Sequence, residues 1–206
     1  GAVSMKSGAP MAGTPEIDQI NLLVGQMARH YKLPWRCSGA CTSAKIFDAQ
    51  AGYEAARNLY GAALAGANFI LSTTGYMEGA LCQSFAKYVV DAEQAELTHK
   101  FLKGIDFSEL DGALNAMNEV DPGGHFLGTK HTLENFEQAF VIPELMHHDS
   151  FEQWEAEGAL DLNSRAVTKA KRMLNDYEMP KLDKAVDEEL LDFIDRRERE
   201  LPDRIL

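Results

Sequence analysis

The chain has 206 residues, of which 45% are hydrophobic and 25% are charged. These proportions are ordinary for a globular chain of one or two domains, and they exclude a disordered, collagen-like or coiled-coil protein. The 32 acidic residues outnumber the 20 basic ones and give a formal net charge of −12. This balance argues against nucleic-acid binding and attachment to an anionic membrane surface, both of which require a basic patch.

We expect neither a membrane span nor a secretory signal. No apolar run approaches the roughly 18 residues that cross a bilayer, and residues 1–6 lack the basic and apolar regions of a signal peptide. The three cysteines, Cys37, Cys41 and Cys82, are too few and odd in number for a disulfide framework. They are interpreted as packing thiols of a cytoplasmic protein.

Residues 1–105 alternate short apolar runs with helical patterns. The runs at residues 1–5, 35–40 and 68–72 start at nearly equal spacing. That spacing predicts three strands of a parallel sheet, each followed by a helix.

Three helices are predicted in this half of the chain. Thr14 followed by Pro15 is typical of a helix start, Asp48 is a good N-cap for the second helix, and the third runs roughly over residues 79–103. Apolar side chains at helical spacing predict the inner faces: Ile17, Ile20, Val24, Met27 and Tyr31, then Tyr53, Ala56, Tyr60, Ala63 and Leu64, then Leu81, Phe85, Val89, Leu97 and Phe101.

Residues 106–206 have the pattern of helices joined by loops. Thr132, Ser150 and Asp183 are candidate N-caps in this half. The sequence therefore predicts an α/β fold with two regions, a βα region over residues 1–105 and a helical region over residues 106–206 that packs on it.

Candidate binding residues follow from the direction of a parallel sheet, because ligands bind beyond the carboxyl ends of its strands. This rule selects residues 6–10, 41–45 and 73–78, which include Thr42, Thr74 and Tyr76. Glu78 is the best-placed carboxylate for a ligand. The alternative is that Glu78 only interacts with the dipole of the following helix.

One loop, residues 121–132, carries three glycines, two histidines and a lysine between two predicted helices. Its His125 and Lys130 are candidate binding residues, because loops often carry function; the alternative is a simple turn. The sequence His147-His148-Asp149 invites a metal hypothesis, but adjacent histidines point to different sides and no second cluster has ligand spacing. We expect a polar loop there and no metal site.

Common catalytic signatures are missing from the sequence. It contains no G-x-G-x-x-G, no G-x-x-x-x-G-K-[ST] and no G-x-S-x-G, so neither a nucleotide site nor a serine nucleophile is supported.

Several segments in a fixed order resemble a known family. They are residues 5–16 (MKSGAPMAGTPE), 48–54 (DAQAGYE), 64–68 (LAGAN), 123–128 (GGHFLG) with His131, Thr132 and Phe136, and 150–154 (SFEQW). Together they resemble the C-terminal part of the trimethylamine methyltransferase (MttB) superfamily. Only standard residues occur, so the resemblance points to members that lack pyrrolysine, which in the family lies at a strand end that we match to the stretch near residues 42–45.

The resemblance implies the last three βα units of a (β/α)8 barrel followed by a helical region. It implies methyl transfer from a methylated or quaternary amine, such as trimethylamine or glycine betaine, to a partner protein that supplies the corrinoid (cobalamin) cofactor. The strand-end segments then line part of the substrate pocket, and Lys6 or Lys130 meets a betaine carboxylate.

Three strands are fewer than the eight of a barrel, and we expect this chain by itself to be inactive. Its open sheet edges predict a homo-oligomer. Two alternatives stay open: a catalytically silent module that packs on other subunits or on the corrinoid protein, and an unrelated α/β protein with a small-molecule site.

Overall fold

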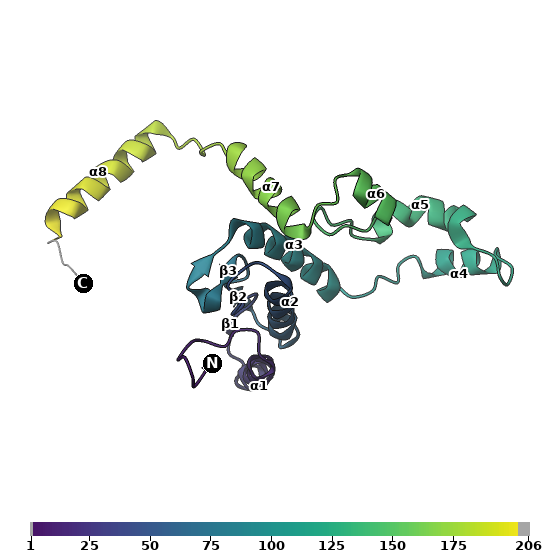
Figure 1. The fold of residues 1–206 in the computed structure, drawn as a ribbon, viewed down its shortest axis with the longest axis horizontal. Coiled ribbons are helices and arrows are strands. Elements are labelled where there is room, and N and C mark those ends of the chain that lie inside the picture. The colour runs from purple at the N-terminus through teal and green to yellow at the C-terminus, as the bar shows by residue number, and fades with distance from the viewer. Residues whose placement is uncertain (1, 202–206) are drawn as a thin grey trace. The chain divides into compact units, whose positions relative to one another are not determined.

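The computed structural model describes residues 2–201. Two compact units make up the chain, residues 1–171 and 172–206. The boundary predicted near residue 105 rests on sequence pattern rather than on compactness, and it stays a prediction. Within the described residues, far more of the chain is helical than extended, and the fold is mixed α and β (Figure 1).

A parallel strand pair lies at the centre of the first unit. Strands β1 (Arg36–Ser38) and β2 (Phe69–Leu71) pair in parallel, with Cys37 opposite Ile70. Helix α1 (Pro15–Tyr31) precedes β1, and α2 (Ala49–Leu64) connects the two strands. Figure 1 shows α1 beside α2 and the strands beside α2, so the βαβ unit expected from sequence is confirmed here.

Local chemistry accounts for the helix starts. The Asp48 carboxylate accepts hydrogen bonds from the backbone N–H groups of Gln50 and Ala51 and caps α2. Pro15 occupies the first turn of α1, although the Thr14 side chain makes no capping hydrogen bond.

A small antiparallel hairpin separates β2 from the third long helix. It contains β3 (Tyr76–Met77), the 3₁₀ helix η1 (Glu78–Ala80) and β4 (Cys82–Gln83). Helix α3 (Phe85–Leu102) follows, and its first turn is capped by the Ser84 hydroxyl, which accepts from the Lys87 backbone N–H.

The remaining elements are helical. They are α4 (Leu110–Asn118), η2 (Phe126–Gly128), α5 (Lys130–Ala139), α6 (Phe151–Ala156), α7 (Leu162–Asn175) and α8 (Lys184–Glu200). The caps predicted at Ser150 and Asp183 are confirmed for α6 and α8. The cap predicted at Thr132 is wrong: Thr129 caps α5 and accepts from the Thr132 backbone N–H. No helix among residues 2–201 is both long and apolar enough to cross a membrane.

Small residues dominate the buried core. One cluster joins α3 to α7 through Ala86, Val89, Ala166 and Ala170, with Leu145 between them. The Glu93 carboxylate fixes this arrangement, because it accepts from the backbone N–H groups of Leu145 and Met146.

The strand predicted at residues 1–5 is wrong. Val3 pairs with Pro10 in an isolated antiparallel bridge, and residues 2–5 do not join the β1–β2 sheet; residue 1 lies outside the described part. The reason is a local turn, in which the Ser4 N–H donates to the Ala9 carbonyl and Gly8 has a φ of 71°.

The predicted inner faces of the helices are largely wrong. Ile20, Val24, Met27 and Tyr31 of α1 are exposed, whereas Asn21 and Gly25 are buried. A Cβ at Gly25 would lie 2.2 Å from the Ala65 carbonyl oxygen, so α1 approaches α2 through a glycine rather than through large side chains.

The same shift occurs in α2 and α3. Tyr53 and Leu64 are exposed, while α2 buries Ala51, Ala55, Leu59 and Ala62. In the third predicted face only Val89 is buried, and Leu81, Phe85 and Phe101 are exposed. Leu81 lies in the hairpin, because α3 starts at Phe85 rather than at residue 79.

Candidate functional site

A buried lysine joins the chain segments that leave β1 and β2. The Lys87 side chain, on α3, is completely buried, and its ammonium donates to the Ala40 carbonyl oxygen at 2.9 Å and to the Asp91 carboxylate. Asp91 Oδ2 also accepts from the Gly75 backbone N–H at 2.8 Å. Because Ala40 follows β1 and Gly75 follows β2, this ion pair fixes the exits of both parallel strands.

Burial sets the protonation preferences around this ion pair. It raises the pKa of the Asp91 carboxyl, while the Lys87 ammonium and the hydrogen bond from Gly75 act in the opposite direction. Burial also raises the pKa of the neighbouring Cys41 thiol. Because the thiolate is the nucleophile, a raised pKa disfavours Cys41 as a catalytic nucleophile.

A second buried carboxylate organises the loop after β1. Glu54, on α2, accepts from the Thr42 hydroxyl at 2.6 Å, from the Ser43 backbone N–H at 2.8 Å and from the Gln50 amide at 2.9 Å. The Thr42 hydroxyl accepts in turn from the Ala44 backbone N–H at 3.0 Å. Since these groups satisfy one another, they hold the loop in place instead of presenting free polar atoms.

The strand exits border a hollow of about 260 Å³. Its lining is mostly small side chains from five parts of the chain: Ala2, Pro10, Met11, Ala12, Ile17, Ser38, Gly39, Cys41, Asn58, Ser72, Gly79 and Ala80. Asn58 is buried and donates to the Cys41 carbonyl oxygen at 3.0 Å, while its own Oδ1 has no hydrogen-bond partner among the described residues. The hollow therefore combines mostly apolar walls with a few polar side chains, as small-ligand sites do.

Four of the residues predicted from sequence lie at the strand exits. Thr42 is buried, Thr74 follows β2, Tyr76 starts β3, and Glu78 starts η1 with a φ of 50°. The Glu78 backbone N–H donates to the Ala44 carbonyl oxygen at 3.1 Å, which ties the two loops together. None of the four belongs to the lining of the hollow, and their contact with a ligand stays a prediction.

The other three predicted residues are exposed, and they belong to parts of the sequence other than the loops after β1 and β2. Lys6 is exposed in the N-terminal turn, and His125 is exposed directly before η2. Lys130 is exposed at the start of α5, where its Nζ lies 3.7 Å from the Glu134 carboxylate. A role for any of them in binding also stays a prediction.

Of the two histidines before α6, only His147 lies near carboxylates, and one of these, that of Glu157, is ten residues away in the sequence. His147 Nε2 lies 3.5 Å from the Asp149 carboxylate and 3.3 Å from that of Glu157. These three ligand atoms lie within 4.8 Å of one another. Both carboxylates are exposed, and Gln153 also donates to Glu157, so the expectation of no metal site here stays a prediction.

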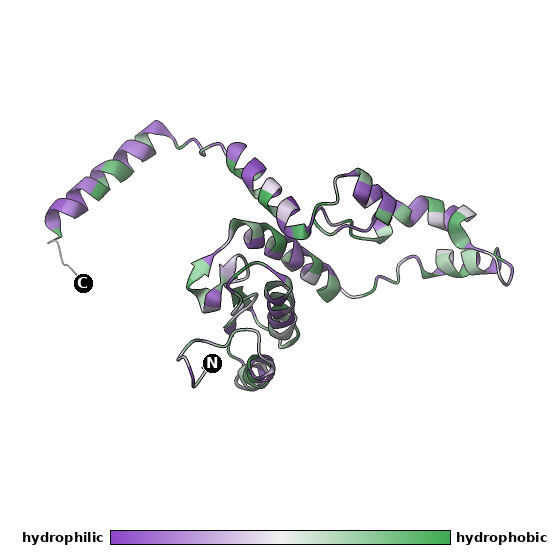
Figure 2. Cartoon of the chain, in the orientation of Figure 1, coloured by the Kyte–Doolittle hydropathy of each residue, from purple (hydrophilic) through white to green (hydrophobic). Residues whose placement is uncertain are grey.

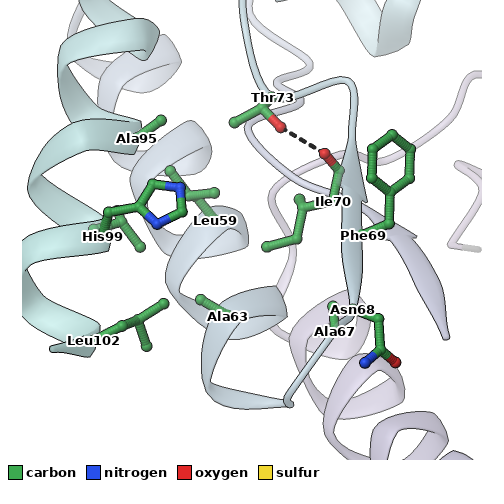
Figure 3. A pocket seen from close by; sticks show the side chains of 11 residues that line it. Leu59, Ala63, Ala67, Asn68, Phe69, Ile70, Thr73, Ala95, His99 and Leu102 are labelled. Carbon is green, nitrogen blue, oxygen red and sulfur yellow. Dashed lines mark hydrogen bonds between the residues drawn. The ribbon is translucent and has the colours of Figure 1, made fainter. Parts of the chain in front are cut away.

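A second hollow, also of about 260 Å³, lies between α2, β2 and α3 (Figure 3). Figure 3 shows Leu59 from α2 and His99 from α3 facing Ile70 of β2, with the Thr73 hydroxyl donating to the Ile70 carbonyl oxygen. Asn68 Oδ1 accepts from the Trp35 backbone N–H. Because this hollow lies between the helices and β2 rather than at the carboxyl ends of the strands, it is not the better candidate site.

Sequence reasoning missed Lys87, Asp91, Glu54 and Asn58. Lysine and aspartate four residues apart on a helix are typical of a solvent-exposed ion pair, and nothing in that spacing indicates burial. The available signal was the apolar run of residues 88–90 between them, which is unusual on a solvated face.

Comparison with known proteins identifies the family of the chain. The sequence profile named trimethylamine methyltransferase (MTTB) matches residues 1–202. The chain belongs to this family. A glycine betaine methyltransferase from Desulfitobacterium hafniense (strain Y51) is 36% identical over 197 residues, which is 96% of this chain and 41% of the relative.

Further members of the family are similar over the same span. Trimethylamine methyltransferase MttB2 from Methanosarcina mazei is 30% identical over 95% of this chain and 39% of its own length. Trimethylamine methyltransferase MttB from Methanosarcina barkeri is 29% identical over the same shares. The chain thus spans about two fifths of the length of these curated relatives.

Proposed function

We propose that this chain forms the C-terminal part of a methyltransferase that moves a methyl group from a methylated or quaternary amine to a corrinoid protein. Membership of the family carries the proposal, and the relatives named for glycine betaine and for trimethylamine support the two candidate donors. The higher identity to the glycine betaine enzyme favours a quaternary amine. A cytoplasmic homo-oligomer is part of the proposal, supported by three free thiols and by open strand edges.

The fold supports this proposal through its βα order. Strands β1 and β2 are parallel neighbours, α2 connects them, and α3 follows β2. This is the repeating unit of a (β/α)8 barrel, in which active sites lie at the carboxyl ends of the strands. We propose that these two units, with the N-terminal turn, form one sector of such a barrel.

The hollow at the strand exits is the proposed position of the methylated ammonium group. Its volume of about 260 Å³ suits a small amine, and its lining is mostly apolar or small. The buried Asn58 is one of the polar residues of that lining. In this role the chain's residues orient the amine and exclude water, which is a contribution of proximity and orientation. The corrinoid of the partner protein supplies the nucleophile.

Lys87, Asp91 and Glu54 act as positioning residues in this proposal. They hydrogen-bond to the backbone that follows β1 and β2, and so set where the lining of the hollow lies.

A hollow-narrowing variant tests the proposed site. The protein is residues 1–202 joined to the preceding part of the Desulfitobacterium hafniense relative, and the assay follows methyl transfer from glycine betaine or trimethylamine to reduced corrinoid protein. Ser38→Leu, at the wall of the hollow, is expected to raise the KM for the amine at least tenfold, because its added methyl groups occupy the ligand volume. The matched control is Arg36→Leu, on the same face of β1 but outside the lining.

Each outcome is informative. A raised KM in Ser38→Leu alone supports the site, while equal KM values in both variants contradict it. A joined protein that folds but transfers neither methyl group contradicts the proposed function. We expect the 206-residue chain by itself to be inactive, and measurable turnover by it would refute that expectation.

A further inference from the structure

The backbone after β2 is held in a conformation that most of its residues adopt only under strain. Among residues 2–201, the residues other than glycine with a positive φ are Lys32, Ser72, Glu78, Ala80 and Ala159. Three of these five lie between residues 72 and 80. Glu78, Gly79 and Ala80 follow one another with φ angles of 50°, 65° and 76°, so they form a left-handed turn. Only glycine adopts this conformation freely, because a Cβ comes too close to the following carbonyl oxygen.

The hairpin formed by β3 and β4 does not by itself require this turn. Residues 78–81 separate the two strands, and hairpin loops of this length are most often built around a type I turn, whose φ angles are negative. Positive φ angles at three consecutive residues, of which only Gly79 is a glycine, therefore need another cause. Strained backbone of this kind is typical of binding and catalytic sites.

Contacts with the loop after β1 keep the turn in its strained conformation. The Glu78 N–H donates to the Ala44 carbonyl oxygen at 3.1 Å. The Gly79 N–H donates to the Thr42 carbonyl oxygen at 2.8 Å. Met77, directly before the turn, belongs to the same buried cluster as Ala44. These contacts offset the strain and fix the turn to the exit of the neighbouring strand.

The turn also packs on the N-terminal turn. A Cβ on Gly79 would lie 3.3 Å from the Cβ of Pro10. Figure 2 shows polar and apolar stretches mixed in the hairpin around β3, and Leu81 is exposed. Apolar burial beyond Met77 therefore does not account for the position of the turn, whereas its contacts with both neighbouring loops do.

The strained residues form part of the wall of the hollow at the strand exits. Ser72, Gly79 and Ala80 all line it. Lys32 and Ala159 lie outside the lining: Lys32 ends α1 as a left-handed C-cap, which is a common use of this conformation, and Ala159 lies between α6 and α7. Because Ala80 lines the hollow and is also exposed, its methyl group lies at the opening.

We infer that Ala80 determines the size of the group that the hollow accepts, and that the left-handed turn holds its methyl group in place. The inference rests on the proposed function for the nature of the ligand, a methylated amine. A wall whose backbone is fixed by hydrogen bonds and close packing yields little to a larger ligand. Glycine at position 80 removes the methyl group and the strain together, so it should both widen and loosen the opening.

The Cys41 thiol reports access to the hollow without methyl transfer. Cys41 lines the hollow, whereas Cys37 is buried, Cys82 is exposed, and neither belongs to the lining. The 206-residue chain is treated with N-ethylmaleimide or with the bulkier N-phenylmaleimide, and peptide mass spectrometry measures the rate at each thiol. Both reagents react with the thiolate, so a change in the ratio of their rates reports a change in the room for the larger one. Ala80→Gly is expected to raise the ratio of phenyl to ethyl reagent at Cys41 about threefold or more, because one methyl group of the wall is gone.

Ala159→Gly is the matched control, because it makes the same substitution at a left-handed residue outside the hollow. Both variants are expected to raise the melting temperature by about 1–3 °C, since glycine relieves the same strain. The maleimide ratio should change only in Ala80→Gly and only at Cys41. An unchanged ratio at Cys41 in Ala80→Gly, an equal change in Ala159→Gly, or a lower melting temperature of Ala80→Gly would each overturn the inference.

A second measurement uses residues 1–202 joined to the preceding part of the Desulfitobacterium hafniense relative. N,N-dimethylethylamine is larger than trimethylamine by one methylene group, and Ala80→Gly should raise kcat/KM for the larger amine relative to the smaller about tenfold. Ala159→Gly should leave this preference unchanged. A joined protein that transfers no methyl group contradicts the proposed function, and the maleimide ratio then decides on Ala80. Methyl transfer with the same preference in Ala80→Gly as in the wild type contradicts the inference alone.

Discussion

The first unit and α8 each contain a lysine paired with a carboxylate four residues later, and the two pairs differ mainly in burial. The Lys87 and Asp91 side chains are 0% and 4% exposed, and they hold the exits of two strands. The Lys184 and Glu188 side chains are 91% and 67% exposed, and their atoms lie 3.6 Å apart. Water screens the second pair, so it contributes little to stability, whereas removing one member of the first leaves an uncompensated buried charge.

This difference explains why the strand exits are a better foundation for a site than the helical region. A ligand site needs its surrounding groups held in one geometry, and buried hydrogen-bonded charges provide this because every alternative arrangement leaves a polar atom unpaired. The side-chain caps of α5, α6 and α8 only set where these helices start, and they do not fix one helix against another.

The largest expected effect is that of Lys87→Met. The substitution preserves much of the side-chain volume but leaves Asp91 buried without its counter-ion, so we expect a loss of about 3–5 kcal/mol in the free energy of unfolding. Urea denaturation of the chain measures it. Lys184→Met, the exposed counterpart, should cause no measurable change.

A double variant sharpens this test. Lys87→Met combined with Asp91→Leu removes both charges, and we expect it to recover part of the lost stability, because no buried charge remains unpaired while the Ala40 carbonyl and the Gly75 N–H still lack their partners. Equal losses for Lys87→Met and Lys184→Met would contradict the contrast between the two regions.

An intermediate effect is expected where α1 packs on α2. Gly25→Ala should destabilise the chain by about 1–3 kcal/mol, because the new Cβ would meet the Ala65 carbonyl oxygen at 2.2 Å. Gly52→Ala, in α2, meets no atom within 4 Å and should stabilise it by up to about 1 kcal/mol, since alanine has the higher helix propensity. Thermal unfolding compares the two, and a stabilising Gly25→Ala would show that the helices are not in close contact.

The sequence predicted the parts of the fold that depend on local chemistry. Asp48, Ser150 and Asp183 cap helices as expected, because a cap needs only a short side chain and the next N–H groups. The parallel pairing of β1 and β2 followed from two apolar runs separated by a helix.

The inner faces and the buried charges were not predictable in this way. In α1 the large apolar residues predict one face, but the close approach at Gly25 selects another. Burial of Lys87 depends on the Ala40 carbonyl, 47 residues away, and no local pattern reports such a partner. The strand predicted at residues 1–5 does not form, because the turn around Gly8 satisfies the backbone groups of this segment locally.

The smallest expected effect is the pH dependence of the cap on α7, which opposes that of the buried pair. The Asp161 carboxylate accepts from the Ser164 backbone N–H at 2.7 Å, and this hydrogen bond lowers the pKa of Asp161. Its stabilising contribution is therefore complete above the ordinary aspartate pKa of about 4 and is lost as the pH falls through the lower pKa of the folded state. Asp161→Asn keeps an acceptor that does not titrate, so stability measured from neutral to acidic pH should fall less steeply than in the wild type. At Asp91 burial raises the pKa, so the contribution of this group to the free energy of unfolding is instead lost as the pH rises through the pKa of the folded state. If stability falls equally with decreasing pH in the wild type and in Asp161→Asn, the exposed cap carries no measurable part of the stability. Burial alone then accounts for the difference between the two regions.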